Sequence, residues 1–220
     1  MVAKTAARNP TASVNSPEIS GKAAPSTKVL QSRISFRAPV FYVTTEQVRE
    51  PSGVTVRRDV VRHPGSVVVM AVDDASQPWR VLLIRQFRYA AARELWEFPA
   101  GRIDKGEQTL AAAKRELREE TGITAQRWKK ALTFFVSPGF LDETMALFLA
   151  RGLTQGEAQP EEDEVIHARF FPLSLAVKMV MAGKIVDAKT IAGVLWLDKF
   201  CAGNASAVSG SSTVPRCRPE

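Results

Sequence analysis

The segment GRIDKGEQTLAAAKRELREETGI, residues 101–123, carries the strongest pattern in this chain of 220 residues. Its apolar spacing predicts a helix from about Thr109 to Thr121, and Gly122 is well placed to end that helix with a left-handed cap. One face of the predicted helix is apolar and can pack against a sheet. That face consists of Leu110, Ala113 and Leu117.

Three glutamates of the same helix, Glu116, Glu119 and Glu120, stand at positions i, i+3 and i+4 and therefore share a face. We expect them to be presented together, away from the core. Carboxylates this close repel one another unless a cation neutralises them, and hard divalent cations such as Mg²⁺ take oxygen ligands. The face is therefore a suitable platform for one to three metal ions. The alternative is a solvated charged face with pairs such as Arg115 to Glu119.

The whole segment resembles the signature of the Nudix hydrolases, and every fixed position is filled. The matching residues are Gly101, Glu107, Arg115, Glu116, Leu117, Glu119, Glu120, Gly122 and Ile123. The resemblance implies an α/β fold, in which a mixed sheet lies inside an α/β/α sandwich. It also implies hydrolysis of a nucleoside diphosphate linked to another moiety.

The same resemblance assigns roles within the segment. The family binds metal through acids that correspond to Glu116, Glu119 and Glu120, and often through a backbone carbonyl that corresponds to Ala100. Mg²⁺ is the implied cofactor, with Mn²⁺ as a substitute. Metal ions would neutralise the charges of a pyrophosphate that otherwise repel an attacking water.

Arg115 and Glu107 correspond to orienting partners, since an arginine can hold a carboxylate through two hydrogen bonds. An ordinary surface ion pair is the alternative. Gly101, Glu107 and Gly122 are structural positions of the motif.

Residues outside the segment must select the substrate. Pro138, within SPGF at 137–140, matches a proline that marks the ADP-ribose pyrophosphatase subfamily, although a turn between strands explains it as well. The stretch LLIRQFRYAAARELWEFPAGRID resembles the corresponding stretch of bacterial ADP-ribose pyrophosphatases. Arg88 matches an arginine that contacts the substrate's phosphates, and Glu97 matches an acid near the nucleotide and metal. The alternatives are a surface arginine and a strand-end acid with its own partners.

An acidic run at 161–164 precedes the stretch VIHARFFPL. In the subfamily, a glutamate of the corresponding loop acts as the general base. Counting back from RFFPL places that role on Glu162, with Glu164 two residues further on. A solvated acidic loop is the alternative.

Composition bounds the rest of the chain. Residues 1–32 are predicted to be a disordered basic tail, 33–200 a single domain and 201–220 a second disordered tail. The formal net charge is +7, and more than half of that excess lies in the tails, which also lack stacking aromatic residues. Nucleic acid is therefore an unlikely partner. No apolar run is long enough for a membrane helix. The two cysteines lie near the C-terminal end, so a reducing cytoplasm fits best.

Strands are predicted over 34–48 and 54–63, within an N-terminal region of 33–63. The subfamily resemblance implies a homodimer in which this region packs on the partner. Arg57 and Arg58 could then reach the nucleotide across the interface. The alternative is a monomer whose strands extend their own sheet. Further strands are predicted over 65–74, 80–88, 95–101, 131–137, 143–151 and 165–173, and helices over 173–184 and 187–200.

The leading hypothesis is metal-dependent hydrolysis of ADP-ribose to AMP and ribose 5-phosphate. The first alternative is the same chemistry on another nucleoside diphosphate sugar or on a dinucleotide. The second is a module that senses ADP-ribose without cleaving it.

Overall fold

The computed structural model describes residues 27–158 and 165–208. Its central strand, β4 (Ser66–Asp73), is buried at every position except the last. Side chains alternate along a strand, so Val68 and Met70 join one apolar cluster while Val67 and Val69 join another. Because both faces of β4 are apolar, both faces of its sheet must be covered.

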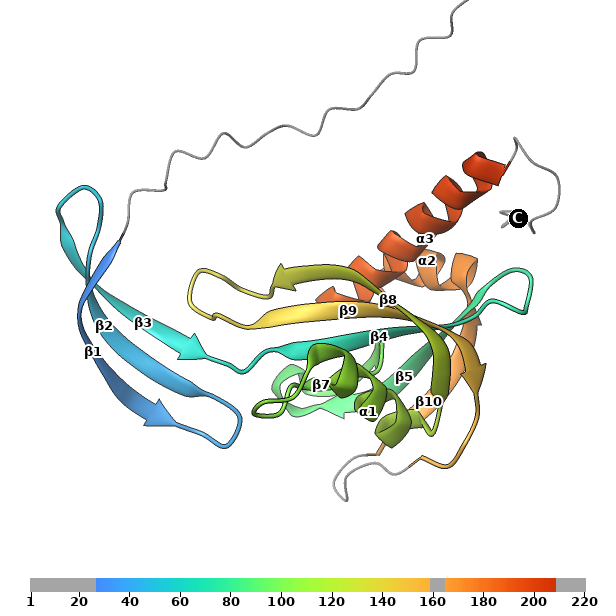
Figure 1. Cartoon of the computed structure of the whole chain (residues 1–220), viewed down its shortest axis with the longest axis horizontal. Helices are drawn as coiled ribbons and strands as arrows, with labels where there is room; N and C mark the ends of the chain where they lie inside the picture. The colour runs from blue at the N-terminus through green and yellow to red at the C-terminus, as the bar shows by residue number, and fades with distance from the viewer. Residues whose placement is uncertain (1–26, 159–164, 209–220) are drawn as a thin grey trace, which may run out of the picture.

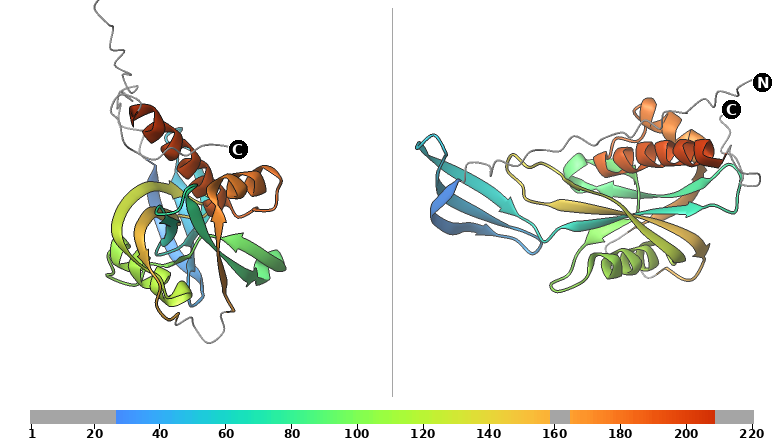
Figure 2. Two further views of the ribbon diagram at one scale, coloured as in Figure 1. Left: turned by 90° about the vertical axis from the view of Figure 1, so that its right-hand side faces the viewer. Right: turned by 45° about the horizontal axis from the view of Figure 1, so that its top comes forward.

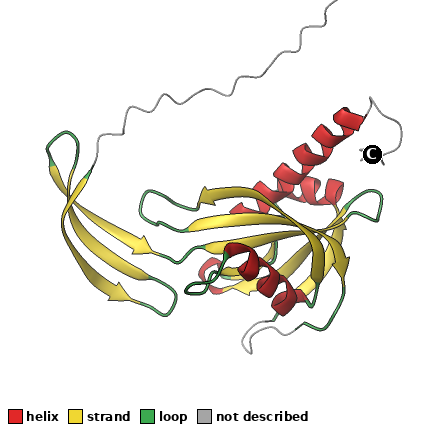
Figure 3. Cartoon of the chain, viewed as in Figure 1, coloured by secondary structure: helices red, strands yellow, loops and turns green. Residues whose placement is uncertain are grey.

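The main sheet is built around β4. Its strand order is β10-β5-β4-β9-β8, while β6 pairs with β5 and β7 pairs with β4. β9 runs parallel to β4, and the other pairs are antiparallel. β4 and β5 pair only at their hairpin end, and beyond it β4 pairs with β7 while β5 pairs with β6. Figure 3 shows the strands of the sheet in yellow and the helices that lie against it in red. The bounds are β5 (Arg80–Arg88), β6 (Arg93–Glu97), β7 (Ala100–Arg102), β8 (Thr124–Phe135), β9 (Thr144–Thr154) and β10 (His167–Pro172), with a 3-10 turn η1 (Tyr89–Ala91) before β6.

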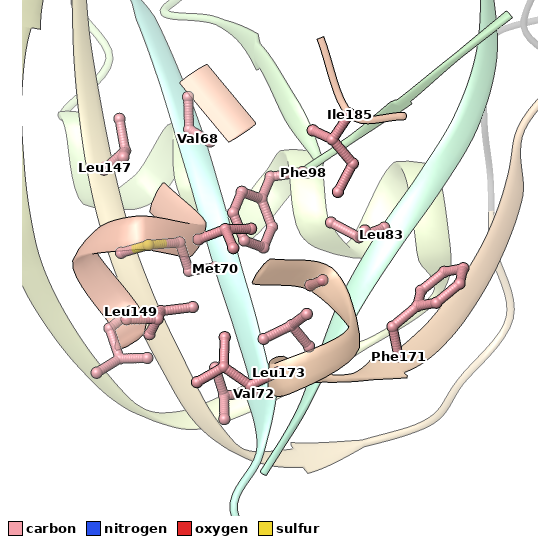
Figure 4. Packing of buried hydrophobic residues seen from close by; sticks show 14 of the residues in the cluster. Val68, Met70, Val72, Leu83, Phe98, Leu147, Leu149, Phe171, Leu173 and Ile185 are labelled. Carbon is pink, nitrogen blue, oxygen red and sulfur yellow. The ribbon is translucent and has the colours of Figure 1, made fainter. Parts of the chain in front are cut away.

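Helices cover both faces of this sheet (Figure 1). α1 (Thr109–Thr121) lies on one face, while α2 (Leu173–Met181) and α3 (Ala188–Val208) lie on the other. On the α2 and α3 side, the fully buried Phe98 lies among side chains of β4, β9 and the segment before α3 (Figure 4). The predicted α/β fold, with a mixed sheet between helices, is confirmed.

The N-terminal strands form a sheet of their own, which projects from the main body (Figure 2). It contains β1 (Lys28–Arg37), β2 (Tyr42–Arg49) and β3 (Thr55–Arg62) in that order. The prediction of one strand over 34–48 is therefore wrong. A turn separates β1 from β2, closed by a hydrogen bond of 2.9 Å from the Ala38 N–H to the Phe41 carbonyl. Pro39 lies in this turn, and a proline has no N–H to donate to a sheet ladder.

Arg62, at the end of β3, ties this N-terminal sheet to the main body. Its Nη2 lies 2.8 Å from Glu46 of β2, and its Nη1 lies 3.1 Å from Asp142, just before β9. The His63 N–H also donates to Asp142 at 2.8 Å. The loop before β9, which contains Pro138, therefore packs against the C-terminal end of β3.

The folded elements extend from Lys28 to Val208, whereas the sequence placed the domain boundaries at 33 and 200. α3 continues past residue 200, and Cys201 packs in the core with only 7% of its surface exposed. In the described parts of the chain, no helix is both long enough and apolar enough to cross a membrane.

Candidate active site

Arg115 is the centre of the predicted motif. Its Nε and Nη2 lie 3.1 and 2.9 Å from the two carboxylate oxygens of Glu107, and its Nη1 lies 2.7 Å from Glu116. The same Nη1 donates to Glu119 at 3.1 Å, and Nη2 donates to the Arg102 carbonyl at 3.0 Å. One guanidinium thus ties the loop before α1, the strand β7 and two acids of α1 together. The structure contains the predicted two-bond pairing of Arg115 with Glu107.

This pairing has a clear electrostatic consequence. The hydrogen bonds from Arg115 hold the pKa of Glu107 below its usual range, against the opposing effect of partial burial. The bond to Glu107 and the charge of Glu116 in turn raise the pKa of Arg115. Both groups are therefore charged at neutral pH.

Glu116 lies directly against β7. A Cβ added to Gly101 would overlap the Glu116 carboxylate, so only glycine leaves room for that acid. The structure gives a reason for the glycine at the first position of the motif: a side chain there would occupy the space of the Glu116 carboxylate. The Glu116 side chain is 12% exposed.

Glu120 lies one helical turn further along α1 and is also directed at β7. It accepts a hydrogen bond of 3.2 Å from the Ala100 N–H, and only 5% of its surface is exposed. The expectation that this acid points away from the core is wrong, because β7 covers the acidic face of the helix. Leu110, predicted to be packed, is 37% exposed instead. The packed face of α1 consists of Ala112, Ala113 and Leu117.

Glu116 and Glu120 therefore meet consecutive residues of β7, Gly101 and Ala100. Glu119 is the more exposed acid of the three, with a 36% exposed side chain held by Arg115. Among the described residues, no three acids, histidines or cysteines converge on a single metal position. The donor set is nevertheless carboxylate oxygen alone, which suits a hard divalent cation. Mg²⁺ in particular is commonly held by one or two carboxylates together with water and substrate phosphates.

Arg88 and Glu97 are brought together as a second part of the site. Arg88 Nε and Nη2 lie 2.9 and 2.8 Å from the two oxygens of Glu97. The hydrogen bond to Glu97 raises the pKa of Arg88 despite burial, and the charges of Glu120 and Asp187 add to this effect.

Sequence reasoning missed the residues behind Glu97. Lys189 in the first turn of α3 also contacts the Glu97 carboxylate, and it lies 2.9 Å from Asp187. The order Asp187 to Thr190 is a capping pattern in which an acid precedes the helix and accepts the N–H three residues on. The helix was predicted to start at 187, which agrees with this pattern, but nothing in the sequence shows that Lys189 is buried.

Other predicted site residues lie elsewhere in the single chain. Arg57 and Arg58, in the projecting N-terminal sheet, are paired with Asp59 and Glu50. Pro138 is exposed in the loop that packs against β3. Glu162 and Glu164 lie outside the described residues. The structure therefore brings together the predicted site residues that lie between β5 and α1. The roles predicted for the other five remain hypotheses; these five are Arg57, Arg58, Pro138, Glu162 and Glu164.

Gly122 ends α1 in the left-handed conformation, with φ of 71°, as the sequence predicts. A Cβ there would also lie 2.5 Å from the Gly156 carbonyl oxygen, which is backbone and cannot move aside. Gly106 has a similar φ of 83° but open space around it. Gly106→Ala is expected to lower the free energy of unfolding by about 1–2 kcal/mol, the cost of the left-handed conformation.

Gly122→Ala should destabilise the chain by a further ~1–3 kcal/mol, because overlap with backbone adds to the same conformational cost. Urea unfolding of both variants measures the difference. Equal losses for the two variants would show that the contact with Gly156 contributes nothing.

Comparison with known proteins agrees with this geometry. The model of the NUDIX domain family matches residues 62–192. The ADP-ribose pyrophosphatase of Bacillus subtilis (strain 168) is 38% identical over 164 residues, which covers 74% of this chain and 87% of that protein. The ADP-ribose pyrophosphatase of Mycobacterium tuberculosis is 38% identical over 170 residues, which covers 76% of this chain and 80% of that protein. A crystal structure described as an ADP compounds hydrolase has the same fold, with a TM-score of 0.72 at 21% identity, covering 84% of this chain and 98% of that one.

The structure thus combines a mixed sheet between helices with an acidic helix that an arginine holds against one strand. The chain belongs to the NUDIX domain family. The matched region, 62–192, contains β4 to the first turn of α3, and of the N-terminal sheet it contains only the last residue, Arg62.

Proposed function

We propose that this chain hydrolyses the pyrophosphate bond of ADP-ribose, with Mg²⁺, to AMP and ribose 5-phosphate. The observation that carries the proposal is the convergence of Glu116 and Glu120 on consecutive residues of β7, with Arg115 holding the acidic face from behind. The names of the relatives with 38% identity support ADP-ribose as the substrate.

Glu116 and Glu120 would hold the metal, with Glu119 joining them if it leaves Arg115. A bound divalent cation supplies charge neutralisation at the pyrophosphate and lowers the pKa of a water molecule. Mn²⁺ has the same preference for oxygen donors and is the proposed substitute.

The protein's own groups then have separable tasks. Arg115 holds Glu116 and Glu119 through hydrogen bonds from its charged guanidinium. Arg88, anchored on Glu97, presents its remaining N–H groups to an anionic phosphate. Glu162 is the proposed general base, with Glu164 as its alternative.

A panel of substrates tests the choice of nucleotide. ADP-ribose, NADH, diadenosine polyphosphates, ADP-glucose and oxidised dGTP are compared at equal concentration with Mg²⁺, and kcat/KM is measured for each. ADP-ribose is expected to give the highest value. A higher value for a dinucleotide or for another nucleotide sugar would transfer the same chemistry to that substrate. Tight binding of ADP-ribose without turnover would instead indicate a sensing module.

A homodimer is part of the proposal. Every residue of β1 is exposed in the single chain, and the N-terminal sheet carries exposed apolar side chains, among them Val29 at 52%, Ile34 at 43% and Phe36 at 55%. Apolar side chains this exposed are surface that a second copy could remove from water. We propose that a second copy covers part of this apolar surface and that Arg57 and Arg58 then reach the partner's active site.

Light scattering at micromolar concentration should therefore give twice the mass of one chain. A mixture of an Arg57→Ala, Arg58→Ala chain with a Glu120→Gln chain should recover part of the activity, since mixed dimers place both lesions in one site and leave the other intact. A monomer defeats the proposal. Exchange of chains without recovery argues against a shared site.

The cytoplasm is the proposed location, because a reducing compartment suits a chain with one buried free thiol, Cys201, in its described part.

A further inference from the structure

Four charged side chains form an alternating row behind the proposed substrate site. In order they are Arg88 of β5, Glu97 of β6, Lys189 of α3 and Asp187, the residue just before α3. Glu97 lies in the middle and receives both cations: the Arg88 guanidinium on its two oxygens and the Lys189 ammonium on Oε2. The row connects elements that are up to about a hundred residues apart in the chain, and its formal charges sum to zero.

The inner part of this row is closed to water. The Glu97 side chain is 1% exposed and that of Lys189 is 9% exposed. Lysine and glutamate are almost never buried unless they are paired, because an isolated charge in the interior is costly. Burial pushes the pKa of Glu97 upwards, but the Arg88 and Lys189 contacts outweigh it and hold the pKa below its usual value. Glu97 is therefore a carboxylate whose charge depends on both cations.

Lys189 is held rigidly from its own side. Asp187 accepts hydrogen bonds from the Thr190 N–H at 2.9 Å and from the Thr190 hydroxyl at 2.6 Å. The Thr190 hydroxyl in turn accepts the Phe98 N–H at 2.8 Å. Phe98 directly follows Glu97, so the first turn of α3 is fixed to the strand that carries Glu97 at two points. The Lys189 ammonium therefore has a defined position opposite the Glu97 carboxylate.

The outer end of the row is different, because the Arg88 side chain is 38% exposed. Its Nε and one N–H of Nη2 are directed at Glu97, which leaves the Nη1 N–H groups and the second Nη2 N–H outside this pairing. These are the donors that an anionic phosphate would meet. The orientation of the guanidinium plane is set by Glu97, and the position of Glu97 is set by Lys189.

We propose that Lys189 is a positioning residue: it holds Glu97 from the α3 side, and so fixes Arg88 and keeps the row neutral for binding the substrate's phosphates. The inference rests on the proposed function, since it concerns the anion bound at Arg88. Without Lys189, the row would contain two carboxylates, Glu97 and Asp187, and a single cation, Arg88. The site would then carry an extra negative charge where a polyanion has to bind.

Steady-state kinetics on the full chain tests this. Lys189→Met should raise KM for ADP-ribose about tenfold or more and change kcat by less than about threefold, because a charge-supported contact in the bound state is weakened. Lys189→Gln, which can still donate to Glu97, should show the same direction and serves as the deciding variant if Lys189→Met does not fold. Lys199→Met is the matched control, since that lysine lies on the same helix with an 84% exposed side chain.

Three further tests separate positioning from mere stabilisation. In a Glu97→Gln background, adding Lys189→Met should raise KM by less than about threefold, because residues that act through one another are not additive. The Kd for ADP-ribose in EDTA, where hydrolysis does not proceed, should rise in parallel with KM. Lys189→Arg, which keeps the charge, should recover part of the loss.

A lower Tm with unchanged KM and Kd in every folded Lys189 variant would overturn the inference. It would also be overturned if the increase in KM of the double variant equalled the product of the increases in the two single variants. A wild-type chain that binds ADP-ribose without cleaving it would contradict the proposed function alone, since the change in Kd remains a valid readout for Lys189.

Discussion

The Glu120→Gln chain is expected to lose at least about 100-fold in kcat while its fold remains intact. The side-chain amide has the same shape as the carboxyl group and can still accept the Ala100 N–H, so the buried contact with β7 is preserved. What is lost is a negative charge at the proposed metal position. A metal ion contributes several kcal/mol to the stabilisation of the transition state, and each ~1.4 kcal/mol corresponds to a tenfold change in rate.

The measurement is kcat at increasing Mg²⁺, with circular dichroism and Tm as checks of the fold. Glu94→Gln is the control, because that acid of β6 is 43% exposed and is paired with Arg85 rather than with the motif. It should retain full activity. Near-normal turnover of Glu120→Gln at saturating Mg²⁺ would show that the acidic face of α1 does not hold the catalytic metal.

Gly101→Ala is expected to cost a similar amount of activity through an uncharged change. The new methyl group would occupy the place of the Glu116 carboxylate, so that carboxylate must move away from β7. Its bond to Arg115 would be disturbed by the same movement. A displacement of about 1 Å at a catalytic site can cost about a hundredfold in rate.

Gly139→Ala is the matched control, since a Cβ at Gly139 meets nothing within 4 Å and its backbone is not in the left-handed region. Both variants are assayed for kcat and for the Mg²⁺ concentration that gives half-maximal activity. The account expects loss only in Gly101→Ala, with a higher Mg²⁺ requirement. Equal activities would mean that Glu116 need not lie against β7.

The motif segment was the most predictable part of the molecule. α1 spans Thr109–Thr121 and ends at a left-handed Gly122, as its apolar period and its terminal glycine indicate. These features depend on local sequence alone, and so does the continuous apolar run that predicts the buried strand β4. The α/β class followed from the same local patterns together with the family resemblance.

Contacts between distant segments account for what the sequence did not predict. Glu120 is buried because β7 returns to cover the acidic face of α1, and the helix period alone has no information about that strand. Pro39 marks the break between β1 and β2, but the apolar residues on both sides of it favoured one continuous strand. Lys189 looks like a surface lysine until α3 is packed against β6, about ninety residues earlier in the chain.

The most direct test of the central claim is phosphorus NMR of ADP-ribose incubated with the full chain, with Mg²⁺ and then with excess EDTA. Metal-dependent hydrolysis at the α1 acids predicts that the two pyrophosphate signals disappear and that two phosphomonoester signals, from AMP and ribose 5-phosphate, grow in equal amounts. EDTA should stop the reaction, and renewed Mg²⁺ should restart it. Persistent pyrophosphate signals with Mg²⁺ present, or hydrolysis that continues unchanged in EDTA, would contradict the account.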